Sequence, residues 1–290
     1  MTAAKRPVIR IGCQANAWER ELPLRERRPE HFAETLRQLA VAGYEGVELP
    51  AWTIPDLDQP PAVRELLERY SLALAAVHVA GVFWDRASFT DGVLPLARQA
   101  GACAAGAGAE NVLVSAFPKR SAGQAGAVRK TADELRLQAY HLGEVARLNQ
   151  ELGLRTFYHN HYEEFLHGEE ELQSILAIDP SLLNLAFDTA NAARALPGDA
   201  LVDAMGRHWA RTGYLHFKDM AGTILVEALG DGEIDFDAIG VLIRERGFSG
   251  WVVAEIEPAP GMVTNRTVLE DAGLSCAFIR STLGRTAASP

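Results

Sequence analysis

The sequence has few cysteines and no long apolar run. Its three cysteines, Cys13, Cys103 and Cys276, are too scattered for a disulfide framework or a zinc ribbon, so we expect free thiols and a cytoplasmic protein. No window approaches the roughly 18 uninterrupted apolar residues of a membrane-spanning helix. The opening MTAAKRPVIRIG has no apolar core typical of a signal peptide. We therefore expect neither a transmembrane segment nor a secretion signal.

Basic residues are scarce relative to acidic ones. The chain has 28 Lys and Arg against 38 Asp and Glu, which gives a formal net charge of -10. The electrostatic field of a protein with this negative charge repels phosphate backbones and anionic membranes. We therefore expect a small-molecule substrate, with no nucleic acid and no membrane as partner. Assembly into a homo-oligomer is left open.

Short apolar runs alternate regularly with longer segments of helical period. Strands are predicted at 8–14, 44–50, 72–79, 111–116, 156–161, 183–188, 214–219 and 251–256. Helices are predicted at 31–43, 60–70, 91–108, 130–152, 169–176, 200–209, 236–246 and 268–283. This alternation is typical of parallel strands joined by crossover helices.

Eight strands and eight helices are the number that a closed (β/α)₈ TIM barrel needs. No Pro/Gly/Ser-rich linker interrupts the series, so we expect one α/β TIM-barrel domain over residues 1–290, with its core at about 8–284. A doubly wound open sheet is the alternative. It is disfavoured because no GxGxxG turn follows the first strand, where Gly12 precedes Cys13-Gln14-Ala15.

Ionisable side chains gather at the carboxyl ends of the predicted strands, which in a TIM barrel form the catalytic mouth. A buried strand ends in apolar residues unless something requires the charge. These ends carry Glu48, His78, His159 with His161, Asp188, His216 with Lys218, and Glu255. Their clustering is the main functional signal in the sequence.

Two imidazoles and two carboxylates from adjacent strands form a shell suited to a divalent transition metal. His159 and His161 are two apart on a predicted strand and therefore face the same side. Together with Asp188, His216 and Glu255 they offer nitrogen and oxygen ligands for Mn²⁺, Co²⁺, Zn²⁺ or Fe²⁺, whereas Mg²⁺ prefers oxygen alone. We expect one divalent ion, with Mn²⁺ as first candidate and Co²⁺, Zn²⁺, Fe²⁺ or Mg²⁺ as the others.

Each of these side chains also has a purely structural interpretation. His78 could be a hydrogen-bonded core residue, Asp188 could cap a following helix, and Glu255 could be a solvated carboxylate. Gly230-Asp231-Gly232 is predicted to form a turn. Aromatic residues after the first three strands could line a sugar pocket or simply pack, namely Trp18, Trp52, Phe83 and Trp84.

The motifs at these positions resemble the xylose-isomerase-like barrel family of sugar phosphate isomerases and epimerases, and within it inosose (2-keto-myo-inositol) dehydratase and its relatives. The matching segments are FYHNHYEEF at 157–165, FDTAN at 187–191, HFKD at 216–219, LGDGEIDF at 229–236 and GWVVAEIE at 250–257. The resemblance covers nearly the whole chain. It implies a metal held by an acidic residue on strand five, an Asp on six, a His on seven and a Glu on eight.

The last three of those ligands correspond to Asp188, His216 and Glu255. Where many relatives carry the acidic ligand of strand five, this chain has His159, which we take as the fourth ligand, with His161 as the alternative. An imidazole in place of a carboxylate leaves the site one unit more positive. This change is expected to strengthen Lewis acidity and to weaken metal retention.

The resemblance implies a metal-dependent sugar isomerase or epimerase that removes a proton next to a carbonyl through a metal-stabilised enediolate. An inosose-type dehydratase is the alternative outcome on the same site. His161 and Glu255 are expected to transfer the proton, and Lys218 to stabilise the oxyanion. Substrate hydroxyls are expected to bind Glu48, His78 and Glu164.

Two other function classes stay open. A metal-dependent endonuclease acting at abasic DNA sites uses the same barrel, but it needs a basic groove and further histidine ligands, and the net charge of -10 argues against it. A barrel that has lost catalysis and only binds a sugar would carry no metal.

Overall fold

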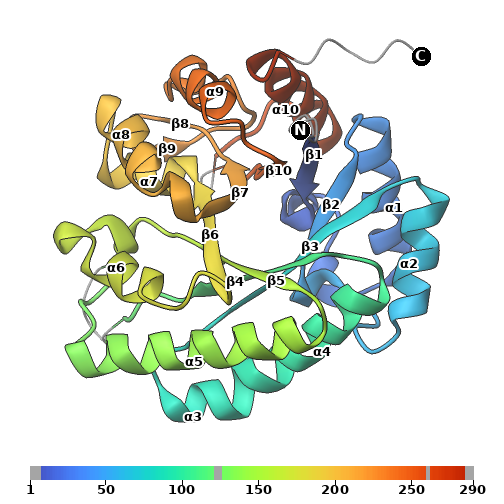
Figure 1. Ribbon diagram of the computed structural model, residues 1–290. Helices are drawn as coiled ribbons and strands as arrows, with labels where there is room; N and C mark the ends of the chain where they lie inside the picture. Colours follow the sequence, from blue (N-terminus) through green and yellow to red (C-terminus); the bar gives the residue numbers. More distant parts are fainter. Residues whose placement is uncertain (1–7, 121–125, 259–261, 285–290) are drawn as a thin grey trace, which may run out of the picture.

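A computed structural model describes residues 8–120, 126–258 and 262–284, and at its centre eight parallel strands close into a barrel (Figure 1). The order around the barrel is β1-β10-β7-β6-β5-β4-β3-β2. The strands are β1 (Ile9–Gln14), β2 (Gly46–Pro50), β3 (Ala73–Gly81), β4 (Asn111–Ala116), β5 (Arg155–His159), β6 (Leu183–Asp188), β7 (Thr212–Phe217) and β10 (Gly250–Ala254). A short antiparallel hairpin is formed by β8 (Met220–Ala221) and β9 (Ile224–Leu225).

The helices lie outside the ring of strands (Figure 1). They are α1 (Pro29–Val41), α2 (Pro60–Arg69), α3 (Arg86–Ser88), α4 (Leu94–Gly106), α5 (Ala132–Glu151), α6 (Glu170–Leu176), α7 (Thr189–Ala195), α8 (Asp199–Arg207), α9 (Phe236–Glu245) and α10 (Val268–Thr282). Local sequence explains where the longest ones begin. Capping boxes start α5 at Thr131 with Glu134 and α10 at Thr267 with Glu270, because each pair satisfies two backbone N–H groups.

The predicted TIM barrel is confirmed, and the open-sheet alternative is wrong. The first and last barrel strands pair in parallel, from Ile9 opposite Gly250 to Cys13 opposite Ala254, and this pairing closes the ring. Each of the eight predicted strands overlaps an observed one. The prediction of a single domain over the whole chain stays a prediction.

The structure differs from the sequence prediction after β5 and β6. The predicted strand reached His161, but β5 ends at His159. The backbone leaves the sheet there because the Asn160 side chain takes over the pairing: its Oδ1 accepts the N–H of Asp188 at 2.9 Å. Helix α7 lies outside the predicted helix ranges and begins directly after β6; Asp188 caps it by accepting the N–H of Asn191, which confirms the capping interpretation of Asp188.

Large side chains fill the barrel interior close to where the strands begin. Phe157, Tyr214 and Trp251 form a buried cluster with small residues of β3. Gly46 makes room for this cluster, since a Cβ there would overlap the Trp251 ring. The apolar filling therefore occupies the base of the barrel and leaves the carboxyl ends of the strands to polar residues.

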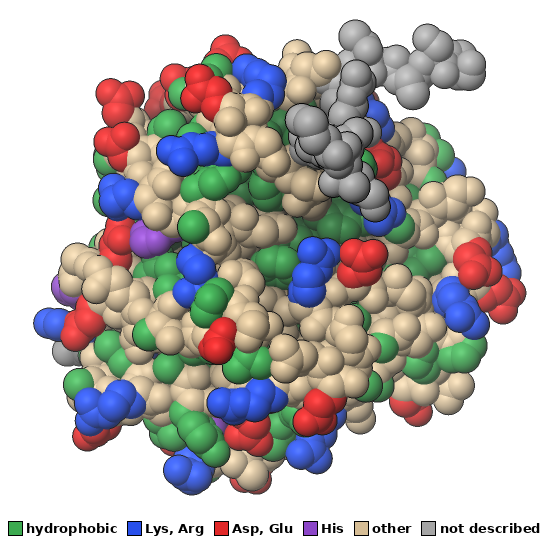
Figure 2. Space-filling view, in the orientation of Figure 1, with side chains coloured by type: hydrophobic (Ala, Val, Ile, Leu, Met, Phe, Trp, Pro, Cys, Tyr) green, Lys and Arg blue, Asp and Glu red, His purple; other side chains and the backbone are tan. Residues whose placement is uncertain are grey.

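Charge on the molecular surface is mixed. On the face drawn in Figure 2, basic and acidic side chains are interspersed, and the Lys and Arg side chains of the described residues form no continuous band there. Within the described parts of the chain, no helix combines the length and the apolarity needed to cross a membrane.

Candidate metal centre and mouth pocket

Four side chains converge at the carboxyl ends of neighbouring strands. His159, Asp188, His216 and Glu255 each offer one ligand atom, and these atoms all lie within 4.8 Å of one another. The side chains come from β5, β6 and β7 and from the residue that follows β10, which are adjacent in the barrel. All four residues are buried. We refer to them as the four-residue cluster.

The cluster contains polar atoms that have no partner among the residues that the structure describes. Oδ2 of Asp188 and Nδ1 of His159 are buried without a hydrogen bond. Leaving such an atom unpaired costs about 1–3 kcal/mol. Burial, together with the negative charge of Glu255, raises the pKa of Asp188 from 3.8 to about 7. Two nitrogen and two oxygen ligands are a donor set that fits a divalent transition metal.

His216 is held from both sides. Its Nδ1 lies 2.8 Å from Oε2 of Glu255, and its Nε2 lies 2.8 Å from Oε2 of Glu48 on β2. Burial lowers the pKa of His216, but the charges of Glu48 and Glu255 outweigh that effect and raise the pKa to about 10. In the protein without metal, His216 therefore carries the positive charge that balances its two carboxylate neighbours.

Lys218 extends the cluster towards solvent. Its Nζ donates to Oε1 of Glu255 at 2.9 Å and also pairs with Glu257. Burial lowers the pKa of Lys218, but the negative charges of Glu255 and Glu257 have a larger, opposite effect. The pKa of Lys218 is therefore raised above its ordinary value. The ammonium group therefore stays charged beside the cluster.

His161 lies next to the four-residue cluster. Its backbone N–H donates to Oε2 of Glu164 at 2.7 Å, and Tyr158 Oη donates to the other oxygen of Glu164 at 2.5 Å. Burial, then the charge of Glu171, raises the pKa of Glu164 to about 8. Burial and the neighbouring His78 lower the pKa of His161 to about 4, and its buried Nδ1 has no partner.

A pocket of about 470 Å³ opens above the cluster, and we call it the mouth pocket. His78, His159, His161, Lys218 and Glu255 line one side, and the lining continues with Asn16, Arg25 and Trp52. Its volume lies within the usual range for small-molecule sites, about 300–1,000 Å³.

The residues predicted to bind substrate hydroxyls fall into two groups. His78 lines the mouth pocket, and its Nε2 lies 2.9 Å from Ser115 Oγ. Glu48 and Glu164 are buried behind the wall and are not among the lining residues. Of the four aromatic residues singled out in the sequence, Trp52 lines the pocket, whereas Trp18 and Phe83 are completely buried.

Sequence reasoning missed several residues at the mouth, among them Asn16 and Arg25. Asn16 lines the pocket with a buried Oδ1 that has no hydrogen-bond partner. Arg25 lines it with its guanidinium 4.5 Å from the centre of the Trp52 ring. Both lie in the irregular segment after β1, where no periodic pattern marks which side chains face inward.

The Gly-Asp-Gly motif has a structural role next to the site. The carboxylate of Asp219 accepts the N–H groups of Met220, Gly230 and Gly232 at 2.8–3.0 Å. A Cβ at Gly232 would overlap Oδ1 of Asp219. The turn interpretation of residues 230–232 therefore fits, and the HFKD and LGDGEIDF segments are parts of one folded loop.

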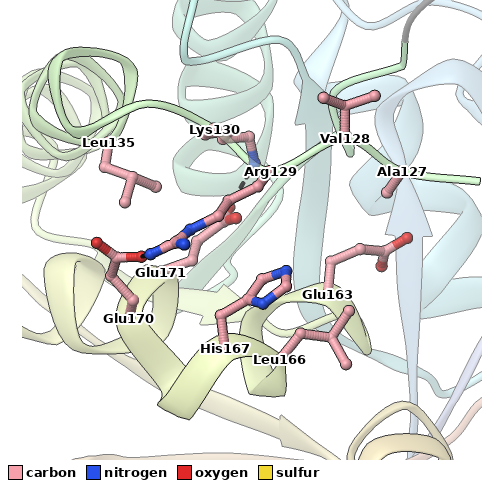
Figure 3. Close-up of a pocket in the computed structure, with 10 residues that line it drawn as sticks. All are labelled: Ala127, Val128, Arg129, Lys130, Leu135, Glu163, Leu166, His167, Glu170 and Glu171. Atoms are coloured by element: carbon pink, nitrogen blue, oxygen red, sulfur yellow. Dashed lines mark hydrogen bonds and ion pairs between the residues drawn. The ribbon is translucent and has the colours of Figure 1, made fainter.

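Figure 3 shows a second pocket, between the segment that precedes α5 and the segment 163–171. Its charged groups pair with each other, Arg129 with Glu170 and Lys130 with Glu171. It shares no lining residue with the mouth pocket. Glu170 and Glu171 therefore hold these two segments together, whereas Glu169 pairs with Arg207 and His208 and Glu164 bonds to Tyr158 and His161.

The chain belongs to the xylose isomerase-like TIM barrel family, which it matches over residues 36–280. It is 26% identical over 261 residues to an inosose dehydratase of Geobacillus kaustophilus, covering 80% of this chain and 83% of that protein. It is also 26% identical over 256 residues to the rhizopine catabolism protein MocC of Rhizobium meliloti, covering 78% and 75%. The resemblance read from the sequence motifs is confirmed.

A solved structure shows the same architecture. A sugar phosphate isomerase/epimerase from Parabacteroides distasonis aligns with a TM-score of 0.71, covering 97% of this chain and 96% of that one, at 19% identity. At this level of identity the likeness demonstrates the shared fold.

Proposed function

We propose that this protein is a divalent-metal-dependent enzyme that removes a proton from the carbon next to a carbonyl in a keto-sugar or an inosose. The observation that carries the proposal is the convergence of four ligand atoms within 4.8 Å beneath a pocket of sugar size. A bound divalent cation, with Mn²⁺ the first candidate, would polarise the substrate carbonyl and stabilise the negative charge that develops on its oxygen.

The ligands of that cation would be His159, Asp188, His216 and Glu255. Among the described residues, the buried Oδ2 of Asp188 has no hydrogen-bond partner, which supports this assignment because a cation would satisfy it. His161 stays the alternative ligand from this part of the chain. His159 is preferred because it is the last residue of β5, whereas His161 lies in the loop that follows the strand.

Proton transfer is assigned to side chains that reach the mouth pocket. His161 lines the pocket, and its imidazole is the first candidate to accept a proton from substrate. Glu255 is the second candidate base, although Lys218 and His216 already contact both of its oxygens. Lys218 would stabilise negative charge on a substrate oxygen or return the proton.

Two outcomes share this first step. Return of the proton on the other face or the neighbouring carbon gives an epimerase or isomerase. Loss of the hydroxyl group from the next carbon as water gives a dehydratase. The inosose dehydratase of Geobacillus kaustophilus aligns with 80% of this chain, whereas the isomerase/epimerase structure shares the fold alone. We therefore rank dehydration of an inosose first and epimerisation or isomerisation of a keto-sugar second.

The test is substrate exchange in deuterated water. Protein loaded with Mn²⁺ is incubated with 2-keto-myo-inositol or with simple keto-hexoses, and deuterium uptake and products are followed by NMR after removal of Mn²⁺. We expect uptake at the carbon next to the carbonyl that disappears after EDTA treatment, with a dehydrated dione from the inosose. Protein that takes up no metal but still binds these compounds would support the non-catalytic barrel instead, and metal-loaded protein that shows no exchange would contradict the proposed reaction.

A further inference from the structure

Glu48 lies behind the four-residue cluster. Its side chain is completely buried and is not among those that line the mouth pocket. Its carboxylate receives hydrogen bonds from three groups: His216 Nε2 at 2.8 Å, Tyr214 Oη at 2.9 Å and Gln14 Nε2 at 2.6 Å. A carboxylate that is bonded on both oxygens and shut off from the pocket is unsuited to bind substrate, which was the role expected for it.

These contacts determine which nitrogen of His216 faces the cluster. Nε2 points at Oε2 of Glu48, and Nδ1 points at Glu255. A neutral imidazole has one N–H and one lone pair, so a proton held on Nε2 by Glu48 leaves the lone pair on Nδ1. Tyr214 binds the same Glu48 oxygen and fixes it in place. Tyr214 and His216 are two apart on β7 and face the same side.

We propose that Glu48 is a positioning residue of the metal centre, which holds His216 in the tautomer that offers Nδ1 to the cation. The inference rests on the proposed function in so far as it requires a cation at the four-residue cluster. Metal-binding histidines commonly donate their second N–H to a carboxylate, and loss of that partner typically lowers metal affinity or activity about 10–100-fold.

Glu48 also connects the cluster to the pocket wall. Its Oε1 accepts from Gln14 and lies 3.6 Å from Nδ1 of His78, which lines the mouth pocket. The ring of His78 is anchored at its other end by Ser115. Glu48 therefore contacts a cluster histidine directly, and Gln14, which donates to Glu48, lies 3.4 Å from Nδ1 of His78.

The test compares Co²⁺ binding by the wild type, Glu48→Gln and Tyr214→Phe, measured by titration calorimetry and by the visible absorption of bound Co²⁺. Glu48→Gln keeps the shape but removes the charge, so we expect about 10–100-fold weaker binding and a changed Co²⁺ spectrum. Tyr214→Phe keeps the contact between Glu48 and His216 and is expected to retain affinity within a few-fold. Equal affinity of Glu48→Gln and wild type would overturn the inference.

A measurement on the wild type covers the case in which Glu48→Gln does not fold. In Zn²⁺-loaded protein with ¹⁵N-labelled histidine, we expect His216 to carry its proton on Nε2, and a proton on Nδ1 would overturn the inference. Wild type that binds no divalent ion would refute the metal centre and this inference together. Wild type that binds Co²⁺ normally but never exchanges substrate protons would refute the proposed reaction alone.

Discussion

Asp188 is expected to have opposite effects on stability in the metal-free and metal-loaded protein. Its Oδ1 caps α7 by accepting the N–H of Asn191 at 2.6 Å, whereas its buried Oδ2 has no partner. Asp188→Asn keeps the capping oxygen and removes the charge. The variant therefore separates the electrostatic cost of the carboxylate from its structural role.

The magnitude follows from the pKa of Asp188, which burial and the charge of Glu255 raise from 3.8 to about 7. A folded-state pKa above the unfolded one means that stability is complete below about pH 4 and is lost as the pH rises towards 7. The difference corresponds to at most about 4 kcal/mol in metal-free protein. Asp188→Asn removes this loss, although its buried amide brings a cost of its own that does not depend on pH.

The assay is urea unfolding of EDTA-treated wild type and Asp188→Asn at pH 4 and pH 8. We expect the stability of the variant relative to wild type to rise by up to about 4 kcal/mol between the two pH values. Mn²⁺ at about one hundred times its Kd is then expected to stabilise wild type by about 3 kcal/mol at pH 8, and the variant by much less. A relative stability that does not change with pH, or equal stabilisation by Mn²⁺, would refute the reasoning.

Three further changes test other parts of the structure. Gly232→Ala forces a Cβ against Asp219 and is expected to lower thermal stability clearly, whereas Gly206→Ala on helix α8, with nothing within 4 Å, should be neutral or stabilising. His161→Ala is expected to keep the metal, measured by elemental analysis, and to lose turnover; loss of the metal instead would make His161 the ligand. Because the pKa of Glu164 is raised to about 8, its stability contribution falls as the pH rises from about 4.5 to 8, and Glu164→Gln should flatten that fall in pH-dependent unfolding.

The barrel was predictable because its strands are short apolar runs and its longer helices carry regular apolar stripes. The meeting of Asp188 and His216 was predictable for the same reason, since the last residues of parallel strands reach the same edge of a barrel. The capping role of Asp188 was foreseen as its structural interpretation, but the extent of α7 was not, because the helix has only seven residues.

The depth of a side chain within the mouth could not be predicted. Glu48 is the middle residue of β2, whereas His78 pairs with Pro50 and so lies two residues nearer the mouth; Glu48 is buried beneath the pocket and His78 lines it. Glu48 is held there by hydrogen bonds that it accepts from Gln14, Tyr214 and His216, of which the last two lie 166 and 168 residues further along the chain. Partners so distant leave no local pattern in the sequence.

In the proposed function, four side chains hold one divalent cation at the barrel mouth. Anomalous diffraction from crystals grown with Mn²⁺ tests it most directly, because the signal locates the ion without reference to activity. We predict one strong peak enclosed by His159, Asp188, His216 and Glu255. Mn²⁺ bound elsewhere, or no peak among these four side chains at saturating Mn²⁺, would contradict the account.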